Sequence, residues 1–352
     1  MLHIGRDIYY LAFVCYLPHH FFNHHRYRAD GILIPVLRQA LSEGFNVIAY
    51  LSPISTMLNY SLTPVQEIKS GLLHSFGVKL LLKREDQNHP HVSGNKWWKL
   101  KYNLAEAERL GHTKLLTFGG AYSNHIFAAA AAAKECGLES IGIVRGDETV
   151  PLNHTLAFAE SCGMKLHFVS REEYRKKTEQ TFIDQLHHQF GDFYLIPEGG
   201  SNEQAIKGCA EFGAHLLSES HIDNVCLPVG TGATLAGVIA GVGNSKKVIG
   251  FSVLKGGDFL SDQIKSHLKN YSGEEFFNWK IMTDYHFGGY AKAPVELLDF
   301  KKSFEHTYQI PLDQVYTAKI MAGIVDLVSK GYFERGTTVL AIHTGGLQGN
   351  KL

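Results

Sequence analysis

The stretch Leu115–Cys136, LLTFGGAYSNHIFAAAAAAKEC, joins an apolar run to a glycine turn and then to an alanine-rich helical pattern. Residues Leu115–Phe118 are short and apolar, as in a buried strand, and Asn124–Cys136 has the length and the alanine content of a helix. Gly119 and Gly120 mark the turn between them. This segment predicts a β-strand that leads directly into an α-helix.

The same alternation continues on both sides of this segment. Further strand-like runs are Val78–Lys83, Ser140–Val144, Lys165–Val169, Phe193–Ile196, Asn224–Pro228, Val248–Val253 and Thr338–His343. Further helical patterns are Trp97–Leu110, Glu203–Ser218 and Ala318–Lys330. Such alternation predicts an α/β fold with mainly parallel open sheets and helices on both faces. In these folds, ligands bind at loops that follow the carboxyl ends of the strands.

Composition limits the classes of function. The chain has 352 residues, enough for two lobes, and Lys plus Arg equals Asp plus Glu at 34 each. No net charge therefore attracts nucleic acid or an anionic membrane surface, and no apolar run reaches the roughly 18 residues of a membrane span. Five scattered cysteines without metal-type spacing indicate reduced thiols, hence a cytoplasmic location. We expect no nucleic-acid, membrane or metal partner.

Residues 1–54 differ from the remainder of the chain, because they show poor periodicity and are rich in aromatic residues and histidine. The clustered histidines are His19, His20, His24 and His25. They could be read as a metal site, but acidic partners and an ordered spacing are missing. An irregular N-terminal extension is the favoured interpretation.

The motif SGNKWWKL, Ser93–Leu100, contains the first candidate for chemistry. Lys96 alone would be read as a solvated surface lysine. Gly94, however, permits close backbone approach, and the tryptophans at 97 and 98 indicate apolar surroundings. Burial among apolar groups lowers the pKa of a lysine and makes it a usable nucleophile and base.

Two turns between a strand and a helix are candidate anion sites. In GGAYSNH, Ser123 is either an ordinary N-cap or part of a carboxylate site built on free helix amides. The second turn is PVGTGATLAG, Pro228–Gly237, whose small residues and hydroxyls suit a phosphate. It has neither the lysine of a P-loop nor the GxGxxG spacing of a dinucleotide fold, and by itself it is weak evidence.

Three C-terminal segments complete the candidate set: VYTAK at Val315–Lys319, IHTGG at Ile342–Gly346, and a turn with Tyr290 after two glycines. Each could be an ordinary loop. Together with the apolar lysine and the two anion-binding turns, they form a combination that chance does not readily produce.

In this combination and order, GNKWWKL, GGAYSNH, GTGAT, VYTAK and HTGG resemble the 1-aminocyclopropane-1-carboxylate deaminase and D-cysteine desulfhydrase family. These are pyridoxal-phosphate enzymes of the tryptophan-synthase-β-like fold, also called fold type II. The resemblance spans about residues 55–349. It implies a large cofactor-binding lobe formed by residues 55–100 and 191–352, a small lobe of residues 101–190 inserted between them, pyridoxal 5'-phosphate as cofactor, a small amino acid as substrate, and a homodimer.

The resemblance also implies a role for each matching residue. Lys96 carries the cofactor as a Schiff base and moves protons, Asn124 lies beside the cofactor's phenolic oxygen, and Thr317 faces the pyridine nitrogen. The substrate carboxylate is bound by Ser123 with the amides of Asn124 and His125. The other matches are the phosphate loop Gly230, Thr231, Gly232, Ala233 and Thr234, the substrate-side tyrosines Tyr290 and Tyr316, and Thr344 beside the cofactor.

Two positions divide this family. Members that open the cyclopropane ring are expected to have glutamate at the position of Thr317 and leucine at that of Thr344, whereas the desulfhydrase type has hydroxyl residues. A threonine can hydrogen-bond a neutral pyridine nitrogen but supplies no charge. Thiolate, with a thiol pKa of about 8.5, is a good leaving group and needs a weaker electron sink.

The sequence thus predicts α,β-elimination of D-cysteine to pyruvate, ammonia and hydrogen sulfide. The alternatives are ring-opening deamination of 1-aminocyclopropane-1-carboxylate and a non-catalytic binding protein of the same fold. Tyr122, Phe127, Trp97 and Trp98 depart from the family pattern, which suggests a pocket that admits something bulkier than cysteine.

Overall fold

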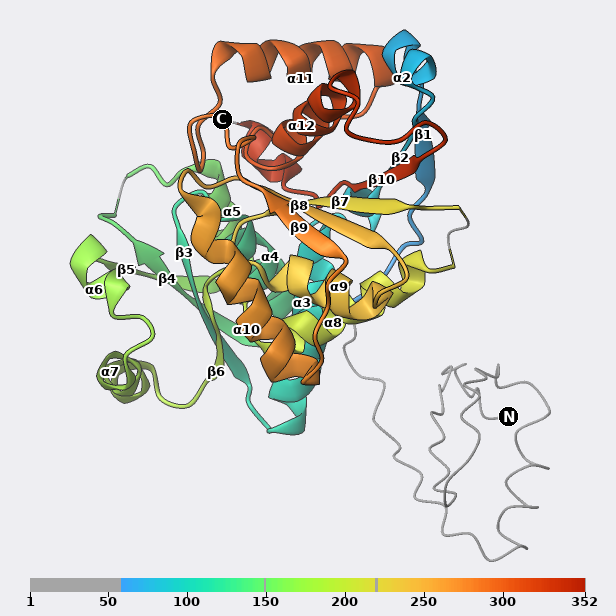
Figure 1. Ribbon diagram of the computed structural model, residues 1–352. Helices are drawn as coiled ribbons and strands as arrows, with labels where there is room; N and C mark the ends of the chain where they lie inside the picture. The colour runs from blue at the N-terminus through green and yellow to red at the C-terminus, as the bar shows by residue number, and fades with distance from the viewer. Residues whose placement is uncertain (1–57, 149, 219–220, 352) are drawn as a thin grey trace, which may run out of the picture. The chain divides into compact units, whose positions relative to one another are not determined.

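The computed structural model describes residues 58–148, 150–218 and 221–351, so the expected extension, residues 1–54, lies outside the described residues. Figure 1 shows a larger sheet with helices above and below it and a smaller sheet to one side. The larger sheet has the strand order β1-β2-β10-β7-β8-β9. Its strands are β1 (Val65–Ile68), β2 (Lys79–Lys83), β7 (Asn224–Val229), β8 (Lys247–Ser252), β9 (Trp279–Met282) and β10 (Thr338–Ile342).

The smaller sheet has the order β5-β4-β3-β6 and is parallel throughout. Its strands are β3 (Lys114–Gly120), β4 (Glu139–Arg145), β5 (Met164–Val169) and β6 (Tyr194–Ile196). Among the described strands of the larger sheet, only β1 pairs antiparallel, with β2. The α/β class with mainly parallel sheets is therefore confirmed, although β1 and β9 were not predicted.

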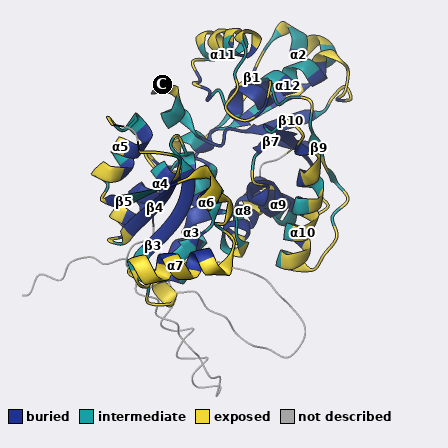
Figure 2. Ribbon diagram, turned by 90° about the vertical axis from the view of Figure 1, so that its left-hand side faces the viewer, coloured by how far each residue is buried: buried dark blue, intermediate teal, exposed yellow. Residues whose placement is uncertain are grey.

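Helices follow almost every strand. In chain order they are α2 (Gly71–Phe76), α3 (Asn95–Arg109), α4 (Asn124–Glu135), α5 (His154–Ser161), α6 (Arg171–Arg175), α7 (Gln180–Phe190), α8 (Glu203–Leu216), α9 (Ala233–Val242), α10 (Leu260–Ser272), α11 (Val295–Tyr308) and α12 (Thr317–Ser329). One apolar cluster joins α3, α8, α9 and α10, and another joins the larger sheet to α2, α11 and α12. Both faces of the larger sheet are thereby covered, which explains its uniformly buried central strands (Figure 2).

Helix α4 shows why an alanine-rich sequence suits its place. Ala128–Ala133 are all buried, and their small side chains let the backbone approach neighbours on several sides while keeping a high helix propensity. The helix begins at Asn124, directly after the carboxyl end of β3, because Ser123 caps it. The sequence motif at the turn is thus held at the edge of the smaller sheet.

The predicted division into lobes stays a prediction, since residues 58–352 group as one compact unit. The sheet does add one fact: β6 pairs with β3 although it follows the predicted end of the small lobe at residue 190. Within the described ranges, no helix is both long enough and apolar enough to cross a membrane.

Candidate active site

Two segments far apart in the sequence meet at the start of α3. Gly94 has φ +68, and a Cβ there would lie 1.9 Å from the carbonyl oxygen of Thr344. The amide of Asn95 donates to the same oxygen at 3.3 Å. Only glycine permits this approach, since a side chain would meet both a left-handed φ and a backbone clash. The contact places Lys96, in the first turn of α3, beside the end of β10.

Lys96 has the electrostatic setting expected of a nucleophilic amine. It is partly buried, and its Nζ donates to Asn95 Oδ1 at 3.1 Å. Burial, and secondly the positive charge of Lys99, lowers the pKa of Lys96 from 10.5 to about 7. A large fraction of this amine is consequently neutral near pH 7 and able to attack a carbonyl group.

Lys99 is a site residue that the sequence reasoning missed. Its side chain is buried, and its Nζ donates to the carbonyl of Gly199 at 2.7 Å and to Thr231 Oγ1 at 3.4 Å. Burial lowers the pKa of Lys99 to about 8. The signal was present in the sequence, because residues three apart on a helix share a face. Lys99 brings a cation to the loop that was read as a phosphate site.

That loop, Gly230–Thr234, joins β7 to α9 as expected. Ser201 Oγ donates to Thr231 Oγ1 at 2.5 Å, and Asn95 Nδ2 donates to Thr234 Oγ1 at 2.9 Å. Gly232 has φ +83, and a Cβ there would lie 3.7 Å from the ring of His267 on α10. The Nε2 atom of His267 is buried without a hydrogen-bond partner. The free helix amides, Lys99 and this orphaned nitrogen surround a position that suits an anion.

The second turn lies at the start of α4. Ser123 Oγ accepts from the amides of His125 and Ile126 at 3.2 and 3.3 Å, so it acts as the helix cap. The Asn124 amide oxygen contacts Gln348 Nε2, which connects α4 to the C-terminal segment. These residues lie together as predicted; their substrate and cofactor roles stay predictions.

His125 contributes its backbone to this turn, whereas its ring points into the interior. Nε2 lies 2.8 Å from Thr117 Oγ1, and Nδ1 is buried without a partner near Gly200. Burial first, and then the charges of Lys96 and Lys99, hold the pKa of His125 well below its usual value. The ring is therefore neutral at physiological pH.

The two predicted tyrosines lie against each other. The ring centroids of Tyr290 and Tyr316 are 6.2 Å apart at 73°. Burial, followed by the proximity of Tyr290, raises the pKa of Tyr316 well above its usual value. A Cβ on Gly230 would lie 3.4 Å from the Tyr316 ring, so this phenol borders the phosphate loop. Tyr316 thus remains a protonated donor near neutral pH.

Lys319 fixes the turn that carries Tyr290. It is fully buried in α12, and its Nζ donates to the carbonyls of His286 and Gly289 at 2.9 and 2.7 Å. Burial lowers the pKa of Lys319 to about 8. The lysine of VYTAK therefore holds the neighbouring loop in place from the helix behind it.

Thr317 has a partner that the sequence reasoning also missed. Its hydroxyl donates to Asp313 Oδ1 at 2.8 Å and accepts from the Asp313 amide at 2.7 Å, and both residues are buried. The threonine itself supplies no charge, and its role opposite the ring nitrogen stays a prediction, but a carboxylate contacts its hydroxyl. A Cβ on Gly346 would lie 3.3 Å from Asp313 Cγ, so this pair is next to the HTGG segment.

Two of the four bulky departures lie in the core, and the effect of the other two on the substrate pocket stays a prediction. Trp97 and Trp98 are buried in the core, where their Nε1 atoms donate to the Asn59 carbonyl and to Glu85 Oε2. Successive helix residues are turned by about 100°, so these rings point away from the Lys96 side of α3. Phe127 stacks on Phe158, with ring centroids 3.9 Å apart. Only Tyr122 of the four is largely exposed.

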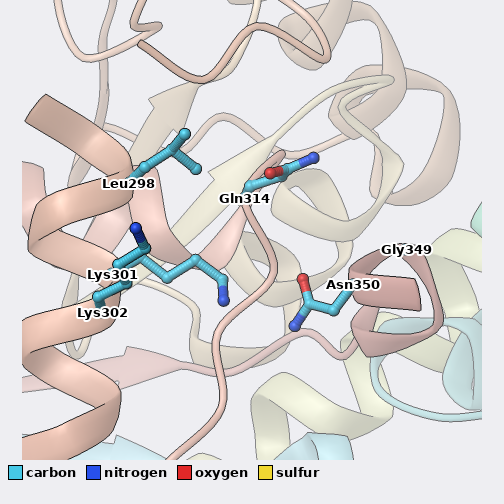
Figure 3. Close-up of a pocket in the computed structure, with 6 residues that line it drawn as sticks. All are labelled: Leu298, Lys301, Lys302, Gln314, Gly349 and Asn350. Atoms are coloured by element: carbon cyan, nitrogen blue, oxygen red, sulfur yellow. The ribbon is translucent and has the colours of Figure 1, made fainter. Parts of the chain in front are cut away.

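A cavity of about 120 Å³ lies elsewhere, beside α11 and the C-terminal segment (Figure 3). It is lined by Leu298, Lys301, Lys302, Gln314, Gly349 and Asn350. None of the predicted site residues lines it. Its Lys301 donates to both carboxylate oxygens of Glu305, whereas Lys302 is exposed. No group of three or more His, Cys, Asp or Glu side chains in the described ranges could hold a metal ion.

The site residues fit an aldehyde cofactor that carries a phosphate. Lys96 offers a partly neutral amine for the aldehyde, and the Thr231 loop offers helix amides, Lys99 and the unpartnered His267 nitrogen for the phosphate. Thr317 offers a buried hydroxyl at a further side of the site. This donor set was assembled from segments far apart in the sequence.

Comparison with known proteins gives the same result. The family model described as "Pyridoxal-phosphate dependent enzyme" matches residues 57–345. The chain is 33% identical to a Thermotoga maritima protein named "Putative 1-aminocyclopropane-1-carboxylate deaminase", over 82% of this chain and 94% of that one. It is 30% identical to the Arabidopsis thaliana "Bifunctional D-cysteine desulfhydrase/1-aminocyclopropane-1-carboxylate deaminase, mitochondrial", over 78% of this chain and 73% of that one.

A solved structure titled "Crystal Structure Analysis of the ACC deaminase homologue" matches with a TM-score of 0.72 and 27% identity, over 84% of this chain and 93% of that one. The predicted fold type, enzyme class and cofactor are confirmed by these matches. The chain therefore belongs to the pyridoxal-phosphate-dependent enzyme family, within its group of 1-aminocyclopropane-1-carboxylate deaminase and D-cysteine desulfhydrase relatives.

Proposed function

We propose that this enzyme eliminates thiol from D-cysteine, converting D-cysteine and water to pyruvate, ammonia and hydrogen sulfide. The observation that carries the proposal is the buried hydroxyl of Thr317, where a ring-opening enzyme is expected to have glutamate. Thr344, also buried, places a second threonine where that activity is expected to have leucine. The Arabidopsis relative, whose name includes both activities, supports either substrate.

In this proposal, the cofactor, Lys96 and Ser123 have separate roles in the elimination. Pyridoxal phosphate, when bound, supplies the electron sink that withdraws charge from the α-carbon. Lys96 would hold the cofactor and, once displaced by the substrate amine, take the α-proton, for which an amine with a pKa of about 7 is well matched. Ser123 and the start of α4 would orient the substrate carboxylate.

The tyrosine pair would act on the leaving group. Because the pKa of Tyr316 is raised, its phenol stays protonated and can donate a hydrogen bond to a departing thiolate. Tyr290, about half exposed, borders the solvent side of the site. Lys99 and the Thr231 loop would hold the phosphate and thereby fix the position of the reacting carbon.

The decisive measurement is the ratio of kcat/KM for D-cysteine to kcat/KM for 1-aminocyclopropane-1-carboxylate. We expect the wild type to favour D-cysteine, and the Thr317→Glu, Thr344→Leu double variant to shift the ratio toward the cyclopropane acid. Thr317→Ser is the matched control, because it keeps the hydroxyl and should keep the direction of preference. A wild-type preference for the cyclopropane acid would refute the proposal.

Two results would favour the remaining alternatives. Turnover of neither compound by a yellow, cofactor-loaded protein would indicate another substrate. A colourless protein in which borohydride fixes no pyridoxyl group on Lys96 would indicate a binding protein of the same fold. The cytoplasmic location and the homodimer expected from the sequence remain part of this proposal.

A further inference from the structure

The turn Leu347–Lys351 follows β10 of the larger sheet, but it is bonded to helices that follow strands of the smaller sheet. The backbone carbonyl of Gln348 accepts from His154 Nε2 at 2.8 Å, and its side-chain Oε1 accepts from Thr155 Oγ1 at 2.9 Å. Its Nε2 donates to Asn124 Oδ1. Gln348 is therefore held by the first turn of α5 on one side and bonded to the first residue of α4 on the other.

Asn124 lies at the same place as the turn that carries Lys96, because the two glycines of HTGG contact both. A Cβ on Gly345 would lie 2.9 Å from Ser93 Oγ, at the turn before α3. A Cβ on Gly346 would lie 2.8 Å from Asn124 Nδ2, at the start of α4. Two adjacent residues thus bring these turns together, and the Nδ2 atom of Asn124 is the one directed toward them.

The direction of the hydrogen bonds along this chain of contacts is fixed at His154. The carbonyl of Gln348 can only accept, so His154 Nε2 carries a proton. The same nitrogen lies 3.2 Å from Thr155 Oγ1, which accepts there and keeps its own proton for Gln348 Oε1. With the Gln348 amide turned round, the proton of the fully buried Thr155 would have no acceptor among the residues that the structure describes. Gln348 consequently presents a donor, Nε2, to Asn124.

The orientation of the Asn124 amide follows from this contact. Its Oδ1 is turned to Gln348, so Nδ2 and its two protons are left for the opposite side, toward Gly346. An asparagine amide that has no such partner can turn by about 180°, because its terminal torsion is soft and its oxygen and nitrogen are similar in size. Without Gln348, Asn124 could present either a donor or an acceptor to the site.

We propose that Gln348 is a positioning residue that fixes the Asn124 amide with its oxygen away from the active site and its donor toward it. The proposal deepens the proposed function, because it rests on the predicted role of Asn124 beside the phenolic oxygen of the cofactor. An ionised phenolic oxygen can only accept, so it is matched by Nδ2 and repelled by Oδ1. The proposal is independent of which amino acid the enzyme turns over.

The test is a double-mutant cycle on the affinity for pyridoxal phosphate, measured by fluorescence titration of the cofactor-free protein. Gln348→Glu keeps the size of the side chain but offers only acceptors, so the Asn124 amide should turn round. Binding should weaken at least about tenfold, because a donor to the cofactor is replaced by a repelling oxygen. Thr155→Val adds no charge and removes the donor that orients Gln348, so it should weaken binding by a smaller factor.

Both variants are then measured in an Asn124→Ala background. Each loss should shrink there to less than about twofold, whereas a loss caused by the added charge or by a disturbed turn would persist. Asn350→Ala is the matched control, because it removes a hydrogen bond of the same turn, from Nδ2 to the Leu312 carbonyl, and should leave the affinity unchanged (Figure 3).

Three results would overturn the inference: unchanged affinity in both single variants, undiminished losses in the Asn124→Ala background, or a loss in Asn350→Ala as large as that in Gln348→Glu. None of them touches the choice of substrate, which the ratio of kcat/KM for the two amino acids measures separately. A wild-type protein that binds no pyridoxal phosphate would overturn the proposed function together with this inference.

Discussion

Replacing Lys96 by methionine should stabilise the cofactor-free protein. The pKa of Lys96 is lowered from 10.5 to about 7, chiefly by burial, so protonation is less favourable in the folded than in the unfolded chain. At pH 7 the unfolded lysine is fully protonated and the folded one about half. At about 1.4 kcal/mol per pKa unit, this difference in protonation lowers the free energy of unfolding of the wild type by about 4 kcal/mol at pH 7.

Because the pKa of Lys96 is lower in the folded than in the unfolded chain, the destabilisation depends on pH. Between pH 7 and 10.5 the unfolded state binds more protons, so the wild type gains stability as the pH rises. The cost falls to about 2 kcal/mol at pH 9 and vanishes above pH 10.5. Methionine removes the ionisable group but also the hydrogen bond to Asn95, worth about 1 kcal/mol. The net gain should therefore be about 3 kcal/mol at pH 7 and about 1 kcal/mol at pH 9.

Denaturant unfolding of the cofactor-free proteins at both pH values measures these differences. Lys101→Met is the matched control, because it removes a lysine of the same helix that is paired with a carboxylate. Lys101 Nζ donates to Glu211 at 2.6 Å. It should lose up to about 1 kcal/mol and gain none. If Lys96→Met is no more stable than the wild type, or if its advantage is equal at pH 7 and pH 9, burial does not depress the pKa of this amine and the reasoning fails.

Three other changes have distinct expected outcomes. Lys99→Met should weaken the binding of pyridoxal phosphate at least about tenfold, because one charge-assisted contact to the phosphate is lost. A fluorescence titration measures this affinity. If the affinity for pyridoxal, which has no phosphate, fell by the same factor, the role proposed for Lys99 would be contradicted. Lys319→Met should speed hydrogen exchange in the turn before Tyr290 and raise KM more than it lowers kcat; unchanged exchange there would argue against a positioning role. A chain that starts at Met57 should unfold at the wild-type temperature and bind cofactor, whereas one that starts at Ser61 also loses a buried leucine and should be less stable by about 2 kcal/mol or more; equal melting temperatures for the two truncations would refute this.

Much of the fold could be predicted because its units are local in sequence. A strand, a turn and a capped helix were predicted for consecutive residues in Leu115–Cys136, and the structure has β3, Ser123 as the cap, and α4 there. The turn was placed too early, because Gly119 and Gly120 still belong to β3 and the turn follows at Ala121 and Tyr122. The segment that carries Lys96 likewise forms the start of α3 after Gly94. Periodicity and turn chemistry act over a few residues, so a single sequence records them.

Edge strands were harder to predict. β1 and β9 have four residues each, and β1 pairs antiparallel at the margin of the larger sheet. Short strands contain too few residues to show a clear period, and their pairing depends on the neighbour that the fold supplies. The partner Asp313, in contrast, lies only four residues before Thr317, so its contact could have been considered from the sequence.

The sequence by itself determined the enzyme family and the cofactor, since the motifs that carry them are contiguous. It also singled out Lys96, whose attachment to the cofactor stays a prediction. Only the tertiary structure showed that Lys99 reaches Thr231, 132 residues away, and that Gly94 touches Thr344. It also showed that Trp97 and Trp98 fill the core instead of the site. The physical reason is that a side chain's direction and charge environment depend on packing between segments whose separation along the chain gives no indication of their distance in space.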